Sequence, residues 1–475
     1  MIALEPVIGI EIHVELNTKS KVFSKALASY GSKPNTNINV IDLGYPGTLP
    51  TLNKEVVRQA IKVAIILNCN LNKVMHFDRK NYFYPDVPKN YQITQSRTPI
   101  GYDGYLDIEV DGETKRIGIS RVHIEEDTAK SNHINNKTLL DFNRAGIPLL
   151  EIVTQPDISN AREAMIYVET LRQMLLYSEV SDVKIEEGSM RCDVNISMKP
   201  KSSNELGNKI EIKNIGSIFG VGESIKYEID RQTELINNNV LIEEETRRYD
   251  DKTNTTILMR VKETGNDYRY FPEPDIPYVE LTDEWIEEMR RGIPRMPNER
   301  YRDYLEVGIN DIVANKLIGN KSLSDFFEIL LKNNVNLINA ANILTSDVAG
   351  YLNKNNVSLK DTKLEVDNFI KLLTLLDKGD ISSKIVKELL PDMLANGTDV
   401  EKLIAAKGTK IISDETQLTT IISDIISNNS SAVIDYQNGK DKAIKYLMGE
   451  IMKTTKGQAN PVLARDILIN ILKKQ

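Results

Sequence analysis

Several features that assign a function at once are scarce or absent in this chain of 475 residues. Its two cysteines, Cys69 and Cys192, lie in apolar stretches, so neither a disulfide framework nor a cysteine-based zinc site can form, and a reducing cytoplasm is the simpler setting. No apolar run approaches the roughly 20 residues that span a bilayer, and the first apolar stretch contains acids. We therefore expect a cytoplasmic globular protein that does not contact a membrane.

Common catalytic motifs are also missing. There is no GxxxxGK[ST] phosphate-binding loop, and the nearest glycine cluster, Gly216 to Gly222, has the wrong spacing. The sequence contains no G-x-S-x-G motif, and its four histidines and two cysteines form no recognisable nucleophile pattern. These absences exclude a P-loop enzyme and predict that any amide hydrolysis requires another chain.

The formal net charge of −8 does not indicate a nucleic-acid binder, but the charge is unevenly distributed. Residues 401–475 hold 11 Lys/Arg and 8 Asp/Glu, a balance of +3, which leaves −11 for the first 400 residues. The C-terminal segment is therefore the better candidate for contact with a polyanion, the alternative being an ordinary solvated surface.

The hydrophobic pattern divides the chain. Up to about Asn298, period-2 runs alternate with helical segments, whereas only helical spacing follows, as in Leu323 to Leu331 and Leu418 to Ile426. The Pro- and Gly-containing segment from Gly292 to Arg300 predicts a domain boundary, and a second break falls at 396–400. We expect an α+β protein with domains 1–292, 293–400 and 401–475.

Acidic residues recur on the predicted strands. In the first strand, Glu11, His13 and Glu15 alternate with isoleucine, valine and leucine, so they share one face. The other strand acids are Glu125, Glu126, Glu151, Asp193 and Glu211. If they converge, an oxygen-rich cluster with one imidazole suits Mg²⁺ and phosphate chemistry. The alternative is a set of unrelated acids on half-exposed strands.

Glu151 is the most informative of these acids. It stands between Leu149, Leu150, Ile152 and Val153, and no basic residue is its sequence neighbour. A carboxylate in such surroundings must be neutralised, hydrogen-bonded or paired with a cation to offset the loss of solvation.

Several long strings of sequence together resemble a known family, the B subunits of the tRNA-dependent amidotransferases that correct misacylated Asp-tRNA(Asn) and Glu-tRNA(Gln). The resemblance covers essentially the whole chain in order: VIGIEIHVEL, RKNYFYPDVPKNYQIT, LDFNRAGIPLLEIVTQPD, EEGSMRCDVNIS, IEIKN, DYRYFPEPDIP and KGQANP. It implies a heterotrimer in which an amidase A subunit releases ammonia from glutamine and the assembly is braced by a small C subunit. The B subunit would use ATP to phosphorylate the side-chain carboxylate of the misacylated amino acid, which ammonia then attacks.

The resemblance also implies a fold and a set of site residues. Residues 1–292 would form a mixed, largely antiparallel cradle like that of glutamine synthetase and the guanidino kinases, holding ATP and Mg²⁺, followed by a helical domain and a small helical tail that contacts tRNA. The family's metal and catalytic motif falls on Glu11, His13, Glu125, Glu151, Asp193 and Glu211. Its ammonia route would end at Lys80, Tyr82 and Glu126, where the alternative for the first two is loop scaffolding. Strand parity places Glu125 and Glu126 on opposite faces, and we assign Glu125 to the metal. In the tail, the lysines available to contact tRNA phosphates are Lys440, Lys442, Lys445, Lys453 and Lys456.

Two other functional classes compete with this ligase subunit. One is a tRNA-binding adaptor whose metal site is only structural. The other is a carboxylate-metal nuclease, which the resemblance to the amidotransferase family disfavours. The sequence does not indicate which of the two misacylated tRNAs is the substrate.

Overall fold

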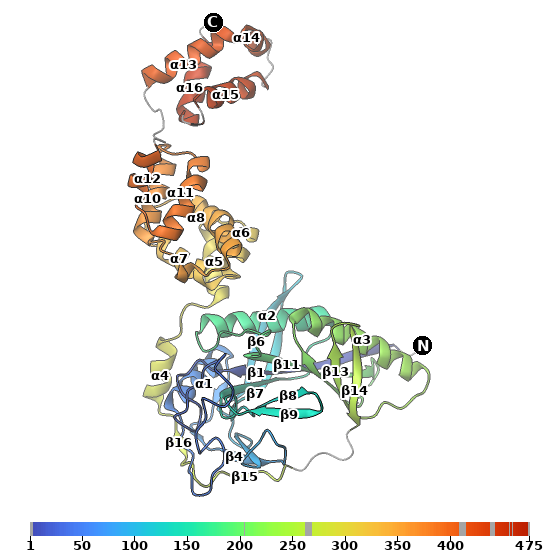
Figure 1. Ribbon diagram of the computed structural model, residues 1–475. Coiled ribbons are helices and arrows are strands. Elements are labelled where there is room, and N and C mark those ends of the chain that lie inside the picture. Colours follow the sequence, from blue (N-terminus) through green and yellow to red (C-terminus); the bar gives the residue numbers. More distant parts are fainter. Residues whose placement is uncertain are drawn as a thin grey trace. The chain divides into compact units, whose positions relative to one another are not determined.

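A computed structural model of the chain describes residues 3–203, 205–261, 268–407, 415–437, 442–455, 457 and 459–473 (Figure 1). These residues form two units, Met1–Met296 and Pro297–Gln475, which are described separately below. In the described part of the chain, no helix is both long and apolar enough to cross a membrane.

A nine-stranded sheet forms the framework of the first unit. Its spatial order is β14 (Thr255–Val261), β13 (Glu245–Asp250), β12 (Ile210–Ile215), β11 (Met190–Pro200), β1 (Leu4–Glu15), β10 (Pro148–Thr154), β7 (Glu113–Glu126), β6 (Gly101–Val110) and β2 (Asn70–Leu71). Neighbouring strands are antiparallel except β12 and β13, which are parallel. The prediction of a mixed, mostly antiparallel N-terminal sheet is confirmed.

The alternation in β1 gives the sheet one apolar and one polar face. Ile8, Ile10, Ile12 and Val14 are almost completely buried, whereas the acids and the histidine between them are half-buried. The same apolar core includes residues of α1 (Lys54–Ile66), α2 (Ala161–Tyr177) and α3 (Ile218–Asn237). Burial of each large apolar side chain contributes roughly 1.5–3 kcal/mol, so this face fixes the strand register and leaves the polar face available for chemistry.

Shorter strands add to this unit. They are β3 (Val74–Met75), β4 (Asp78–Asn81), β5 (Tyr91–Thr94), β8 (Lys130–Ile134), β9 (Lys137–Asp141), β15 (Phe271–Pro272) and β16 (Val279–Glu280), and α4 (Asp283–Arg291) ends the unit. Strand β4 pairs with both β5 and β15, which joins residues near 80 to residues near 271. In Figure 1, α2 and α3 run along one side of the sheet, and β4, β8, β9 and β15 lie on the other.

The second unit is all-helical in its described residues, which confirms the expected all-helical C-terminal region. One apolar core extends from Tyr304 to Leu403, and a separate one extends from Leu418 to Leu472. The first set of helices comprises α5 (Pro297–Glu306), α6 (Asp311–Ile318), α7 (Lys321–Leu330), α8 (Leu337–Ile343), α9 (Ala349–Asn355), α10 (Val366–Asp377), α11 (Ser383–Asn396) and α12 (Val400–Lys407), with a π turn at Leu344–Val348 and a 3-10 turn at Leu359–Asp361. The second set comprises α13 (Glu415–Asn428), α14 (Ser430–Gln437), α15 (Lys442–Thr454) and α16 (Pro461–Leu472). Helix α12 belongs to the first of these cores through Val400 and Leu403.

Candidate active site

Strand register brings acids and histidines together on the polar face of the large sheet. His13 of β1 lies directly opposite Glu151 of β10, and Glu151 lies opposite His123 of β7. Directly paired residues of antiparallel strands point their side chains to the same face, about 4.5–5.5 Å apart at Cβ. Glu125, two residues after His123, therefore shares this face.

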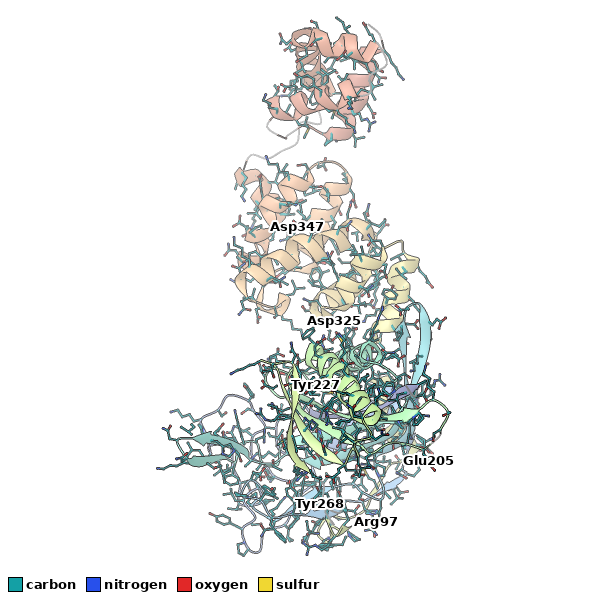
Figure 2. All side chains as sticks on the ribbon, turned by 90° about the vertical axis from the view of Figure 1, so that its right-hand side faces the viewer. Arg97, Glu205, Tyr227, Tyr268, Asp325 and Asp347 are labelled. Carbon is teal, nitrogen blue, oxygen red and sulfur yellow. The ribbon has the colours of Figure 1, made fainter. Side chains whose placement is uncertain are left out.

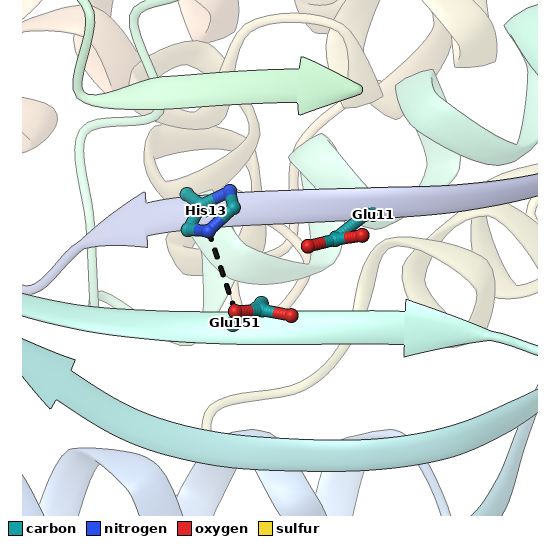
Figure 3. Close-up of side chains that lie close together, drawn as sticks. All are labelled: Glu11, His13 and Glu151. Atoms are coloured by element: carbon teal, nitrogen blue, oxygen red, sulfur yellow. Dashed lines mark ion pairs between the residues drawn. The ribbon is translucent and has the colours of Figure 1, made fainter. Parts of the chain in front are cut away.

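The side chains form a tight cluster. Nε2 of His13 lies 3.4 Å from Oε1 of Glu125 and 3.4 Å from Oε2 of Glu151. Nε2 of His123 lies 3.2 Å from Oε2 of Glu151. Figure 3 shows His13 and Glu11 on one strand and Glu151 on the neighbouring strand, with the ion pair between His13 and Glu151 marked.

The cluster perturbs the titration of its own members. Burial, followed by the negative charge of Glu151, raises the pKa of Glu11 to about 7. Burial lowers the pKa of His13, but hydrogen bonds with Glu125 and Glu151 outweigh it and raise this pKa to about 10. Burial raises the pKa of Glu151, yet the charge and hydrogen bond of His123, together with those of His13, hold it well below its usual range. The imidazole of His13 thus offsets part of the negative charge of the buried carboxylates.

The donor set fits a divalent cation. Glu11, His13 and Glu151 bring ligand atoms within 4.8 Å of one another, as do His123, Glu125 and Glu151. Oε2 of Glu125 is buried and has no hydrogen-bond partner among the described residues. Because carboxylate oxygens dominate and imidazole is a secondary ligand, Mg²⁺ or Mn²⁺ suits the site better than a thiolate-preferring metal.

Asp193 and Glu211 lie in a neighbouring part of the same polar face. Asp193 is directly opposite Glu11 in the register of β1 and β11. Lys213 donates to Asp193 at 2.7 Å and lies 2.9 Å from Glu211, so one ammonium bridges the two carboxylates. Neither acid belongs to the two groups with metal-binding spacing in the described chain, and their metal role remains a prediction.

Glu125 and Glu126 point to opposite sides, as strand parity requires. Glu125 lies in the cluster, whereas the carboxylate of Glu126 accepts from Lys89 at 2.5 and 2.7 Å and from the backbone N–H of Ile93 at 2.9 Å. Lys80, on β4, interacts electrostatically with Glu125 and Glu151, and its ammonium lies 6.0 Å from the ring centre of Tyr82. Of the three residues assigned to the ammonia route, Lys80 and Tyr82 are therefore neighbours, whereas Glu126 points away from the cluster, and their role in a route remains a prediction.

Sequence reasoning missed three charged or titratable members of this face: His123, Arg191 and Lys213. His123 has the parity of Glu125, and Arg191 that of Asp193, so alternation along each strand was the signal that could have identified both. Arg191 lies opposite His13 and donates to Asp127 at 2.7 Å, while its buried Nε has no partner among the described residues.

The lysines assigned to tRNA can be followed only in part. Lys442, Lys445 and Lys453 are exposed on α15, and Lys453 lies 3.4 Å from Glu450. Lys440 and Lys456 lie outside the described residues.

A carboxylate-imidazole cluster accompanied by Lys80, Arg191 and Lys213 on the polar face of a sheet defines a class of site suited to metal-assisted transfer of phosphate or acyl groups. Comparison with known proteins identifies the member of this class. Residues 6–287 match the GatB/GatE catalytic domain, and residues 325–472 match the GatB domain. The B subunit of the aspartyl/glutamyl-tRNA(Asn/Gln) amidotransferase of Lysinibacillus sphaericus is 48% identical over 98% of both chains, and that of Enterococcus faecalis is 47% identical over 99% of both. The chain belongs to the GatB family of amidotransferase B subunits.

Proposed function

We propose that the chain is the ligase subunit of a tRNA-dependent amidotransferase that converts Glu-tRNA(Gln), Asp-tRNA(Asn) or both into the correctly amidated forms. Family membership supports the overall reaction, and the cluster of Glu11, His13, His123, Glu125 and Glu151 is the observation that supports its location in this chain. Aminoacyl-tRNA is used in the cytoplasm, where we place the enzyme. The cradle architecture of glutamine synthetase and the guanidino kinases fits the mixed, mostly antiparallel sheet.

In the proposed reaction, an oxygen of the side-chain carboxylate attacks the γ-phosphorus of ATP, giving an acyl phosphate and ADP. Ammonia then attacks the acyl carbon, the carbon–oxygen bond breaks, and inorganic phosphate leaves. Phosphorylation is needed because an unactivated carboxylate has no adequate leaving group, and orientation with charge neutralisation supplies most of the catalysis in phosphoryl transfer.

Different residues of the site would bind the metal and neutralise the charge of the substrates. Glu11, His13, Glu125 and Glu151 would hold Mg²⁺, which as a Lewis acid lowers the charge on the transferred phosphoryl oxygens. The ammonium of Lys80 interacts electrostatically with Glu125 and Glu151 and would neutralise an incoming carboxylate or phosphate. Arg191 offers its buried Nε on the other side of His13 and would bind a phosphate oxygen. We assign Asp193 and Glu211, held by Lys213, to a second metal position.

Ammonia would come from an amidase A subunit, with a small C subunit as a brace, and would arrive past Lys80, Tyr82 and Glu126. A cavity of about 10 Å³, close to the room needed by one water-sized molecule, is lined in part by Glu126, Asp127 and Lys89. This small cavity beside Glu126 supports a route at that residue. We assign contact with tRNA to the tail of residues 401–475 through its lysines.

One substitution separates this function from the adaptor alternative. Glu151→Gln removes the shared carboxylate and preserves its size. In the assembled enzyme, we expect Glu151→Gln to abolish Mg²⁺-dependent ATP turnover on misacylated tRNA without loss of tRNA binding. Glu109→Gln is the control, because Glu109 is an exposed residue of β6, and it should leave both turnover and binding unchanged. Normal turnover by Glu151→Gln, with a lower melting temperature alone, would instead support a structural metal site.

A further inference from the structure

An aromatic cluster lies beside the acids, and of its members only Tyr82 has a role in the proposed chemistry, on the ammonia route. It is formed by Tyr82, Tyr84, Tyr268 and Tyr270, which we call the tyrosine cluster. Ring centres are 6.4 Å apart for Tyr82 and Tyr84, 6.2 Å for Tyr82 and Tyr268, and 6.1 Å for Tyr268 and Tyr270. Two segments separated by more than 180 residues in the chain therefore build one aromatic surface, near the position of Tyr268 in Figure 2.

Backbone contacts hold the two segments together. The backbone N–H of Asn81 donates to the carbonyl of Tyr268 at 2.9 Å, and its side-chain amide donates to the carbonyls of Tyr268 and Arg269 at 3.1 and 2.8 Å. Arg269 has φ of 47°, in the left-handed region that a non-glycine residue adopts at a cost. This conformation accompanies the placement of its guanidinium 5.6 Å from the ring centre of Phe83.

The surface is open and combines rings with cations. Phe83 is 67% exposed, Tyr84 is 64% exposed, and Tyr270 is 44% exposed. The ammonium of Lys80 lies 5.2 Å from the ring centre of Tyr268. Alternating rings and cations on an exposed surface are the composition by which proteins hold single-stranded nucleic acid, since every base can stack on a ring.

The position of Lys80 relates this surface to the reaction. Its ammonium lies 5.2 Å from the ring centre of Tyr268 and interacts electrostatically with Glu125 and Glu151, so one lysine relates the rings to the acids. In an aminoacyl-tRNA, the amino acid is esterified to the ribose of the 3′-terminal nucleotide. A side-chain carboxylate that reaches the acids therefore places the terminal base about one amino acid away from them.

We propose that the tyrosine cluster, with Phe83 and Arg269, stacks the unpaired 3′-terminal bases of the aminoacyl-tRNA and thereby positions its amino acid at the acids. This inference rests on the proposed function, because only a tRNA-linked substrate brings an unpaired base to this surface. It adds a binding site in the first unit that is separate from the lysines of the tail.

The test uses the full enzyme complex and a tRNA with 2-aminopurine near its 3′ end, whose fluorescence falls when the base stacks. We expect quenching by the wild-type protein, and loss of most of it in Phe83→Ala and Tyr270→Ala. In the same variants, the KM for aminoacyl-tRNA should rise roughly tenfold, within the range measured when an aromatic stacking partner is removed. Phe219→Ala is the matched control, since this phenylalanine is 61% exposed on α3, a helix of the layer that covers the apolar face.

The outcomes separate the two proposals. Unchanged quenching and KM in both variants, with normal amidation, would overturn the stacking site and leave the proposed function intact. Loss of co-elution with the A subunit, with unchanged quenching by the complex that remains, would overturn it in favour of a protein interface. Absence of ATP-dependent activation in the wild-type complex at saturating aminoacyl-tRNA would instead contradict the proposed function.

Discussion

Replacement of His13 tests whether this histidine is a metal ligand or a structural residue of the core. Its Nε2 lies 3.4 Å from both Glu125 and Glu151. At this distance each ion pair is worth about 5 kcal/mol with an effective dielectric constant of about 20, but desolvation of the buried charges opposes most of that attraction. In the absence of Mg²⁺, we therefore expect His13→Ala to spare the fold and lower the free energy of unfolding by no more than about 3 kcal/mol.

The larger effect should be on the metal. Loss of one ligand should raise the Mg²⁺ concentration for half-maximal activation by at least about tenfold, which corresponds to about 1.4 kcal/mol less stabilisation at saturating Mg²⁺. Activation would be measured as ADP formation on misacylated tRNA by the assembled enzyme, and stabilisation as the Mg²⁺-induced rise in melting temperature. His133→Ala is the control, because this histidine is exposed on β8 and interacts with Thr138. A fall of many degrees in melting temperature, with unchanged Mg²⁺ dependence and unchanged activity per folded molecule, would show that His13 is a core residue and refute this reasoning.

Three further predictions concern other parts of the chain. The isolated protein should not hydrolyse glutamine, and release of glutamate at the rate of the complex would contradict the assignment of that step to an A subunit. Deletion of residues 408–475, which spares the buried Leu403, should raise the KM for aminoacyl-tRNA. The log-log slope of affinity against salt concentration should become shallower by roughly 0.7–0.9 per lost phosphate contact. An unchanged slope in a properly assembled truncated complex would exclude a tail contact. Asp325→Asn should destabilise the second unit by about 1–2 kcal/mol at pH 7 in chemical denaturation, a value reduced for partial exposure, because Asp325 accepts from Arg300 at 2.7 Å and Lys321 at 2.6 Å. Burial raises the pKa of Asp325, but those hydrogen bonds outweigh burial and lower the pKa in the folded state. The ion pairs therefore stabilise the fold above the unfolded pKa of about 3.9, and this stabilisation is lost as the pH falls through the lower folded pKa. A difference in stability between Asp325→Asn and wild type that persists at low pH would argue against the ion pair.

Local sequence patterns predicted much of the fold. Alternation along β1 identified the face of Glu11 and His13, and 3.6-residue spacing identified α7 and α13 with their buried positions. The reason is that burial acts on every residue of an element, so its period is recorded in that element alone.

The partners of each strand are recorded only in the pairing between strands. The sequence did not show that Glu151 lies between His13 and His123, because those contacts depend on the order β1, β10, β7 and on a register set by three separate segments. The same limitation hid Lys213 as the bridge between Asp193 and Glu211, and the association of Tyr82 with Tyr268. Strand parity predicted the face to which each side chain points, whereas only the assembled sheet shows which residues that side chain contacts.

The central claim is that this subunit transfers a phosphoryl group to the substrate's side-chain carboxylate before ammonia attacks. It can be tested most directly with misacylated tRNA in which both oxygens of the side-chain carboxylate are ¹⁸O, by mass analysis of the inorganic phosphate that the complete enzyme releases. We predict that each phosphate contains one ¹⁸O atom, because the attacking oxygen stays with phosphorus when the carbon–oxygen bond breaks. Unlabelled phosphate accompanying amidated tRNA would contradict the account.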